Sequence, residues 1–198
     1  AKECNGEIVS ADSRQIYKGL DIGTGKITHE EMCGISHHIL DIIDIDQNFS
    51  VAEYKRHALP LVEDILARGK TPIICGGTGQ YIDSIIFNQS IPEVEPNLTL
   101  RTHLEQKTVD ELYTLLQQKD KRRAQEIDRH NRVRIIRALE IIDSLGYVPE
   151  QITPTFRHAT TIYIMQPSRE LLREKITKRL EKRLNTGILE EAQDLISK

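Results

Sequence analysis

The sequence predicts an α/β protein with a parallel sheet and an inserted helical subdomain. Short apolar runs typical of buried strands alternate with helical patterns in the first half of the chain, as in strand–helix–strand units. Pro92 and Pro96 then bracket an acidic linker, and strand patterns disappear until Thr160. We therefore expect an α/β core made of residues 1–92 and 156–198, and a helical insertion at residues 93–155.

The first predicted strand is the apolar run at residues 7–9, which leads into a long polar loop at residues 10–26. This loop contains too many polar residues and glycines for a simple turn, which indicates that it is built to hold a ligand. Ligands of open α/β sheets bind at the carboxyl ends of the strands. A second strand-like segment is expected at residues 34–44.

A helix is expected to begin after Ser50 and to end at Gly69. Glu53 lies three residues after Ser50, which is the spacing of a capping box, and glycine commonly ends a helix. Pro60 falls inside the helical pattern and should kink or split the helix, because proline lacks a backbone N–H group. A short buried strand is predicted next, at residues 71–75.

The second half of the chain is predicted to be mostly helical. Strand character returns only at residues 160–165. A basic amphipathic helix should follow from about residue 169 to residue 186, because Gly187 would end it. A further helix is expected to begin at Ile188.

The composition is typical of a soluble globular protein, with 38% hydrophobic and 29% charged residues among 198. No apolar run approaches the ~20 residues that span a bilayer, and no signal peptide opens the sequence. Cys4, Cys33 and Cys75 are widely spaced, which argues against a disulfide framework or a zinc site. We expect a cytoplasmic protein without a membrane partner, and a monomer.

The basic residues are clustered although the net charge is −3. The segment from Lys119 to Arg137 contains eight Lys or Arg residues and three acidic residues. The segment from Arg169 to Arg183 contains seven basic residues and three acidic ones. Such clusters on an acidic body are typical of phosphate or nucleic-acid binding, but solvated helix faces have the same composition.

Two loops carry candidate catalytic or binding residues. Asp12 follows the first predicted strand, where a carboxylate can act as a general base or bind magnesium, or simply stabilise a turn. Gly76, Gly77 and Thr78 lie between a predicted strand and a predicted helix at residues 81–87. Backbone N–H groups there, at a helix N-terminus, favour an anion such as diphosphate, although a turn without a ligand has the same pattern.

A third candidate lies on the predicted helix that contains Arg134 and Arg137. Asn131 and these two arginines recur at helical spacing on one face, where they could bind phosphates or a base edge, or form salt bridges. His37 and His38 are poor joint metal ligands, because adjacent side chains on a strand point to opposite faces. No metal ligands are assigned.

Three motifs together resemble the signatures of the bacterial tRNA dimethylallyltransferases, also called tRNA isopentenyltransferases. They are the run from Ser10 to Lys26, the Gly76–Thr78 turn, and the pattern Asn-x-x-Arg-x-x-Arg-Ala-Leu-Glu at residues 131–140. The resemblance extends from Gly6 to about Leu195 and implies a core like that of the P-loop-containing nucleoside triphosphate hydrolases. That family opens with a phosphate-binding loop, G-P-T-[AG]-S-G-K-[ST], which does not occur in this sequence, and we expect it to lie outside the chain.

The resemblance implies transfer of a dimethylallyl group from dimethylallyl diphosphate to N6 of an adenosine beside the anticodon of tRNA. Asp12 matches the family's general base, and Thr78 and Arg179 match residues near the diphosphate. Gly76 and Gly77 belong to the same diphosphate-binding turn, and Mg²⁺ is the implied cofactor. The segments that match tRNA-contacting ones contain Asp12, Ser13, Arg14, Gln15, Val133, Arg134, Ile135, Ile136 and Arg137.

Two other functions stay open. An adenylate isopentenyltransferase or a P-loop small-molecule kinase would share the fold, but a mononucleotide substrate needs no basic helical insertion. A non-catalytic RNA-binding module would account for the basic clusters, but it leaves Asp12 and the Gly76–Thr78 turn unexplained.

Overall fold

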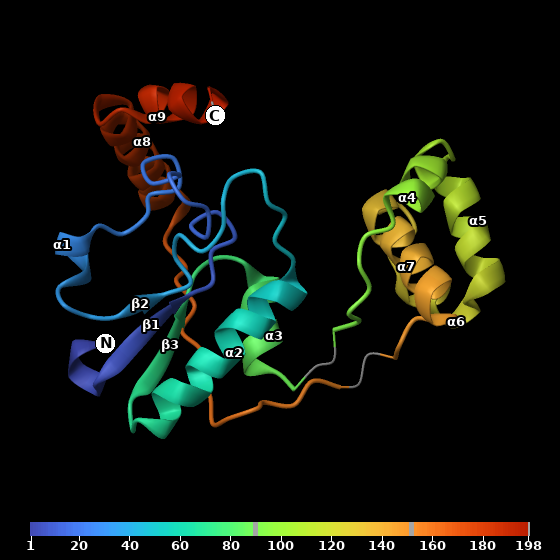
Figure 1. Cartoon of the computed structure of the whole chain (residues 1–198), viewed down its shortest axis with the longest axis horizontal. Coiled ribbons are helices and arrows are strands. Elements are labelled where there is room, and N and C mark those ends of the chain that lie inside the picture. Colours follow the sequence, from blue (N-terminus) through green and yellow to red (C-terminus); the bar gives the residue numbers. More distant parts are fainter. Residues whose placement is uncertain (89–90, 151–152, 198) are drawn as a thin grey trace. The chain divides into compact units, whose positions relative to one another are not determined.

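The computed structural model describes residues 1–88, 91–150 and 153–197. The chain divides into two compact units, Ala1–Asn88 with Thr155–Lys198, and Gln89–Pro154 (Figure 1). The first unit contains a parallel sheet and the second consists of helices. The predicted α/β fold class is therefore confirmed.

The sheet has three parallel strands in the order β2-β1-β3. Strand β1 (Gly6–Ser10) is central, and β2 (His37–His38) and β3 (Thr71–Cys75) lie on either side of it. Ile8 of β1 is in register with Ile73 of β3. The two predicted strands that carry the candidate loops are therefore neighbours, and both run toward the same edge of the sheet.

Strand β2 is much shorter than the segment predicted at residues 34–44, and that prediction is wrong for most of its length. Ile39 and Asp41 have positive φ angles of 61° and 54°, and such left-handed backbone cannot continue a strand ladder. The chain turns here, and the N–H group of Ile42 donates to the carbonyl of Ile16, 2.8 Å away. This segment therefore supports the loop that follows β1.

Helix α2 (Val51–Ala67) packs against β1, β3 and the shorter helix α3 (Gly79–Ile86) (Figure 1). The predicted capping box is present, because Ser50 and Glu53 bond reciprocally, and Gly69 has the positive φ expected after the helix end. Pro60 does not split α2, which runs continuously past it. The rings of Tyr54 and Tyr81 stack with centroids 4.0 Å apart and join the two helices.

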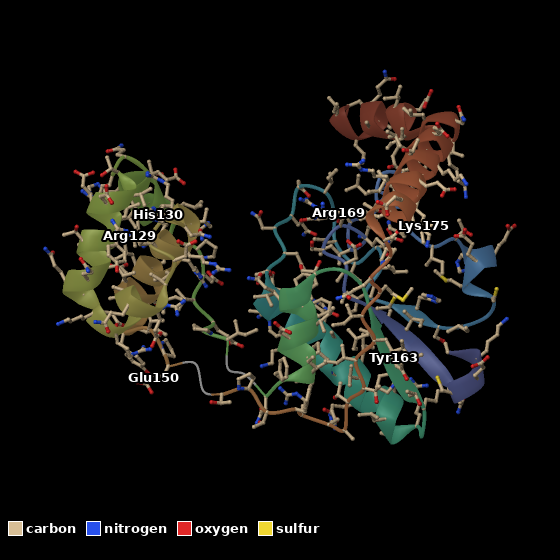
Figure 2. The ribbon with its side chains drawn as sticks, turned by 180° about the vertical axis from the view of Figure 1, so that it is seen from behind. Arg129, His130, Glu150, Tyr163, Arg169 and Lys175 are labelled. Carbon is tan, nitrogen blue, oxygen red and sulfur yellow. The ribbon has the colours of Figure 1, made fainter. Side chains whose placement is uncertain are left out.

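The strand predicted at residues 160–165 is absent from the described residues. A strand needs a partner for its backbone groups, and no described strand pairs with this segment. Tyr163 is 87% exposed and is labelled in Figure 2. After it come α8 (Arg169–Asn185) and α9 (Ile188–Ile196), which confirm the two predicted helices. The 3₁₀ helix η1 (Lys2–Cys4) and α1 (His29–Met32) complete this unit.

The helical unit contains α4 (Leu98–Glu105), α5 (Val109–Lys119), α6 (Lys121–Glu126) and α7 (Arg132–Leu145). Its core is a cluster of buried apolar side chains from all four helices. The carboxylate of Glu140 is also buried, and it accepts bonds from Arg101 at 2.6 and 2.8 Å. A separate cluster forms the core of the α/β unit.

No helix in the described part of the chain is long and apolar enough to cross a membrane. Cys4, Cys33 and Cys75 are exposed free thiols.

Candidate active site

The loops after β1 and β3 are joined by three hydrogen bonds. The N–H group of Ala11 donates to the carbonyl of Cys75 (2.8 Å), and the N–H group of Thr78 donates to the carbonyl of Ala11 (3.0 Å). The N–H group of Ser13 donates to the Thr78 hydroxyl, also at 3.0 Å. These bonds bring Asp12 and Thr78 to the same edge of the sheet, although they lie far apart in the sequence.

Gly76 lets the two loops approach each other. A Cβ atom at this position would overlap the carbonyl of Ala11 and would lie 2.9 Å from the Cα atom of Ala11. A Cβ atom at Gly77 would meet nothing within 4 Å. Both glycines are predicted to bind diphosphate, and the structure in addition gives Gly76 a packing role.

Asp12 is partly buried, and one of its carboxylate oxygens accepts a 2.8 Å bond from the N–H group of Arg14. This turn fixes the side chain, and the structure shows no other bond to the carboxylate among the described residues. Asp12 is also one of three titratable groups that affect Tyr81. Burial is the main cause that raises the pKa of Tyr81 to about 12, and Tyr17, Glu53 and Asp12 raise it further.

Thr78 is the N-cap residue of α3, but its side chain caps none of the helix amides. Its oxygen instead accepts from Ser13, which leaves the hydroxyl proton available for another acceptor. Backbone N–H groups at a helix N-terminus attract anions. The turn can therefore present the Thr78 hydroxyl and the start of α3 to an anionic group beside Asp12.

A buried lysine, which is not among the predicted site residues, holds the loop that follows Asp12. The ammonium group of Lys26 donates to the carbonyl of Tyr17 (2.9 Å), to Asp21 (2.6 Å) and to Asp41. Its side chain is only 5% exposed. No local pattern in the sequence marks this lysine, because its burial depends on residue 41, which folds back onto the loop.

Arg179 lies on α8 and is exposed, and no hydrogen bond or ion pair joins it to Asp12 or Thr78 in the described part of the chain. Arg183, one helical turn further along, lies against Gly25, where a Cβ atom would be 3.4 Å from its Cζ atom. Gly25 in turn accepts a 3.3 Å bond from the side chain of Gln15. Arg179 therefore shares a helix face with a residue that contacts the loop of Asp12.

The predicted RNA-contacting residues on α7 differ in burial: some are exposed and others are buried. Val133 and Arg134 are exposed, whereas Ile135 and Ile136 belong to the core of the helical unit. Arg137 donates to the carbonyl of Val94 (2.7 Å) and to the buried carboxylate of Glu140 (3.4 Å). Val133 and Arg134 are therefore the most exposed side chains of this run of residues, and the side chain of Arg137 is 35% exposed.

An exposed cation near this run was not singled out from the sequence. Arg129 lies 5.5 Å above the centre of the Tyr113 ring, beside His130 (Figure 2). Asn131 caps α7, because its side chain accepts from the N–H group of Arg134 at 3.1 Å. The predicted Asn–Arg face therefore starts with a capping residue.

A family model described as IPP transferase matches residues 15–198. The chain belongs to the IPP transferase family. It is 39% identical over 207 residues to the tRNA dimethylallyltransferase of Oceanobacillus iheyensis, covering 100% of this chain and 66% of that protein. It is 42% identical over 200 residues to that of Anoxybacillus flavithermus, covering 98% and 64%. The chain thus spans about two thirds of the length of these IPP transferase relatives.

Solved structures of the family have the same fold. A tRNA delta(2)-isopentenylpyrophosphate transferase from Staphylococcus epidermidis superposes with a TM-score of 0.64 and 36% identity, over 100% of this chain and 67% of that one. A eukaryotic dimethylallyltransferase acting on tRNA superposes with a TM-score of 0.83 and 27% identity, over 100% of this chain and 51% of that one.

Among residues 1–88, 91–150 and 153–197, no group of three or more His, Cys, Asp or Glu side chains could hold a metal ion. Protein Mg²⁺ sites that serve phosphate chemistry often use one or two carboxylates together with substrate oxygens and water. A single carboxylate, Asp12, beside a predicted diphosphate site fits this kind of binding.

Proposed function

We propose that this chain forms the catalytic core of an enzyme that transfers a dimethylallyl group from dimethylallyl diphosphate to N6 of an adenosine in tRNA. Membership of the IPP transferase family and relatives named tRNA dimethylallyltransferase support the proposal. The observation that carries it is the joining of the Asp12 and Thr78 loops at one edge of the sheet.

The chemistry assigns different tasks to these two residues. The N6 amine of adenine is a weak nucleophile, because its lone pair is delocalised into the ring. As the new C–N bond forms, Asp12 accepts the proton that N6 loses, and this is general base catalysis. The C–O bond to the diphosphate breaks, and its electron pair leaves with the diphosphate. The Thr78 hydroxyl and the amides at the start of α3 stabilise the charge of the leaving group.

Two further groups complete the proposed donor site. Arg179 would neutralise charge on the diphosphate, and Gly77 leaves open space beside the turn. Mg²⁺, bound mainly through diphosphate oxygens and water with Asp12 nearby, would supply additional charge neutralisation. We assign the proton-accepting task to the side chain of Asp12.

We assign tRNA binding to two surfaces, each described within its own unit. The first is the loop Asp12–Gln15, and the second is the exposed part of α7, with Val133 and Arg134, together with Arg129. Arginines on exposed helices bind phosphates or base edges. We further propose that the protein acts in the cytoplasm, since its three thiols are free, and that it acts as a monomer.

The decisive test replaces Asp12 by Asn in the complete protein. Asparagine keeps the size of the side chain and the bond to Arg14 but cannot take the proton. Single-turnover transfer from the prenyl diphosphate to tRNA should fall by roughly 10²–10⁴-fold, the usual contribution of a positioned base. Asp46→Asn, at an exposed aspartate of the same unit, is the matched control.

An unchanged single-turnover rate in Asp12→Asn would contradict the base role. The assay should also offer adenosine monophosphate as the acceptor in place of tRNA. Transfer to the mononucleotide alone would identify an adenylate isopentenyltransferase. Binding of tRNA without any transfer would identify an RNA-binding module.

A further inference from the structure

Glu191 on α9 makes an unusual set of contacts with the loop that follows β1. Its carboxylate accepts bonds from three consecutive backbone N–H groups, those of Asp21 (2.8 Å), Ile22 (2.7 Å) and Gly23 (2.8 Å). Bonds to an ionised acceptor are about twice as strong as neutral ones. One side chain from near the end of the chain therefore fixes three residues of the loop that contains the proposed catalytic base.

Helices α8 and α9, which we call the α8–α9 hairpin, make further contacts with this loop. A Cβ atom on Gly25 would overlap the Arg183 guanidinium, and one on Gly19 would lie 3.7 Å from a methyl group of Leu195. A Cβ atom on Gly187, between the two helices, would lie 3.7 Å from Ile22. Figure 1 shows the blue loop beside α8 and α9.

Helix α8 depends on these contacts for its position, because none of its residues is buried. A helix without a buried face gains little from apolar packing, so a few polar contacts have a large influence on where it lies. Arg179 is on this helix, one turn before Arg183 and on the same face. What fixes the hairpin on the loop therefore also fixes the position of Arg179.

We infer that Glu191 is a positioning residue that holds the α8–α9 hairpin against residues 21–23, and so holds Arg179 in place relative to the loop of Asp12. The inference rests on the proposed function, because it assigns Glu191 an effect on donor binding through Arg179. It predicts that Glu191 and Arg179 act as one unit in binding the prenyl diphosphate.

Glu191→Gln is the informative variant, because it keeps the length and shape of the side chain. An amide has one acceptor oxygen, whereas the carboxylate uses both of its oxygens toward the three N–H groups. The amide nitrogen is a donor and would face another donor. Glu190→Gln is the matched control, because Glu190 is the neighbouring acid of the same helical turn and makes no bond to the loop.

The first measurement is amide hydrogen exchange in the complete protein. Glu191→Gln should speed exchange at the amides of Asp21, Ile22 and Gly23, and Glu190→Gln should leave their rates at the wild-type value. Unchanged protection in Glu191→Gln would overturn the contact itself, whatever the activity of the protein.

The second measurement is a double-mutant cycle on transfer kinetics. Glu191→Gln should raise KM for the prenyl diphosphate about tenfold, the effect of losing one bond to a charged group, with little change in KM for tRNA. In a variant that already carries Arg179→Ala, adding Glu191→Gln should alter KM for the prenyl diphosphate by less than about twofold. The effects of substitutions at coupled residues are not additive.

The outcomes separate the two claims. Equal effects of Glu191→Gln with and without Arg179 would overturn this inference and leave the proposed function intact. Absence of any prenyl transfer by the wild-type protein would overturn the proposed function and this inference together, even if the exchange data reproduced the contact.

Discussion

Gly76 decides how closely the two loops of the candidate site can approach. In Gly76→Ala the new methyl group would overlap the backbone of Ala11, which cannot move without disturbing the end of β1. We expect the free energy of unfolding to fall by about 1–3 kcal/mol, as for other overpacked sites. Gly77→Ala, where space is open, should leave stability nearly unchanged. Urea denaturation of both variants is the measurement, and equal stabilities would contradict the packing role.

Glu7 is the second residue whose environment makes a sharp prediction. Its carboxylate is 5% exposed and bonds to Arg68 (2.5 and 2.9 Å), Lys70 (2.7 Å) and His38 (2.8 Å). The bonds to Arg68 are the main cause that lowers the pKa of Glu7 well below its usual range, and Lys70 and His38 lower it further. Burial opposes this shift but does not outweigh it.

The sign of the pH effect follows from this lowered pKa. A carboxyl group with a lower pKa in the folded state than in the unfolded chain stabilises the fold above its unfolded pKa, about 4.3 for Glu. That stability is lost as the pH falls from there toward the folded pKa. The difference in unfolding free energy between wild type and Glu7→Gln should therefore be largest near neutral pH and should shrink below about pH 4. A difference that grows with acid would contradict this assignment.

At the residue scale, the sequence indicates a candidate site residue where the adjacent residues form a recognisable pattern, such as a predicted strand. Asp12 and Thr78 were singled out because each follows a predicted strand, and the structure joins their loops. Lys26 and Glu191 were missed as site residues, because their partners come from remote segments. Residue 191 lies 168 to 170 positions from the amides that it binds.

At the scale of elements, α7 combines an exposed face with a structural one. Arg134 is exposed, whereas Arg137 bonds to the carbonyl of Val94 and to the buried Glu140. Burial raises the pKa of Glu140, but Arg101, the amide of Asn97 and Arg137 outweigh it, and its pKa is lowered. This carboxylate therefore stays ionised at neutral pH and needs its cationic partners.

Two single variants separate these roles. Arg134→Ala should weaken tRNA binding without loss of stability, and each lost phosphate contact should reduce the salt slope of binding by roughly 0.7–0.9. Arg137→Ala should lower the free energy of unfolding by roughly 1–3 kcal/mol, because it leaves a carbonyl and part of a carboxylate without their donor. Salt-dependent binding and denaturation curves are the measurements. Normal tRNA affinity with an unchanged salt slope in Arg134→Ala would contradict the proposed contact.

Elements were predictable where local patterns decide them. The capping box at Ser50 and the glycines at positions 69 and 187 located helix ends correctly. The segments at 34–44 and 160–165 were misassigned, because their apolar residues fit a strand but pairing is not a local property. Positive φ angles end β2 after two residues, and the second segment has no strand beside it in the described part of the chain.

At the scale of the whole molecule, the described part of the chain contains two cores that share no buried residue. One lies within the α/β unit and includes Ile65, and the other lies within the helical unit and includes Leu112. Both of these side chains are completely buried. Segments with separate cores can open separately, with a free energy of their own.

We therefore expect core substitutions to act within their own unit. Leu112→Ala should lower the opening free energy of the helical unit by about 2–5 kcal/mol, the usual effect of truncating a buried leucine, and Ile65→Ala should do the same in the α/β unit. Amide hydrogen exchange measures the opening of both units in one experiment.

Leu112→Ala should speed exchange in α5 and α7 but not in β1 and α2, and Ile65→Ala should show the reverse. In the double variant the two effects should add, because the sites have no common partner. Loss of protection in both units from either single change would instead mean that the whole chain unfolds as one cooperative unit.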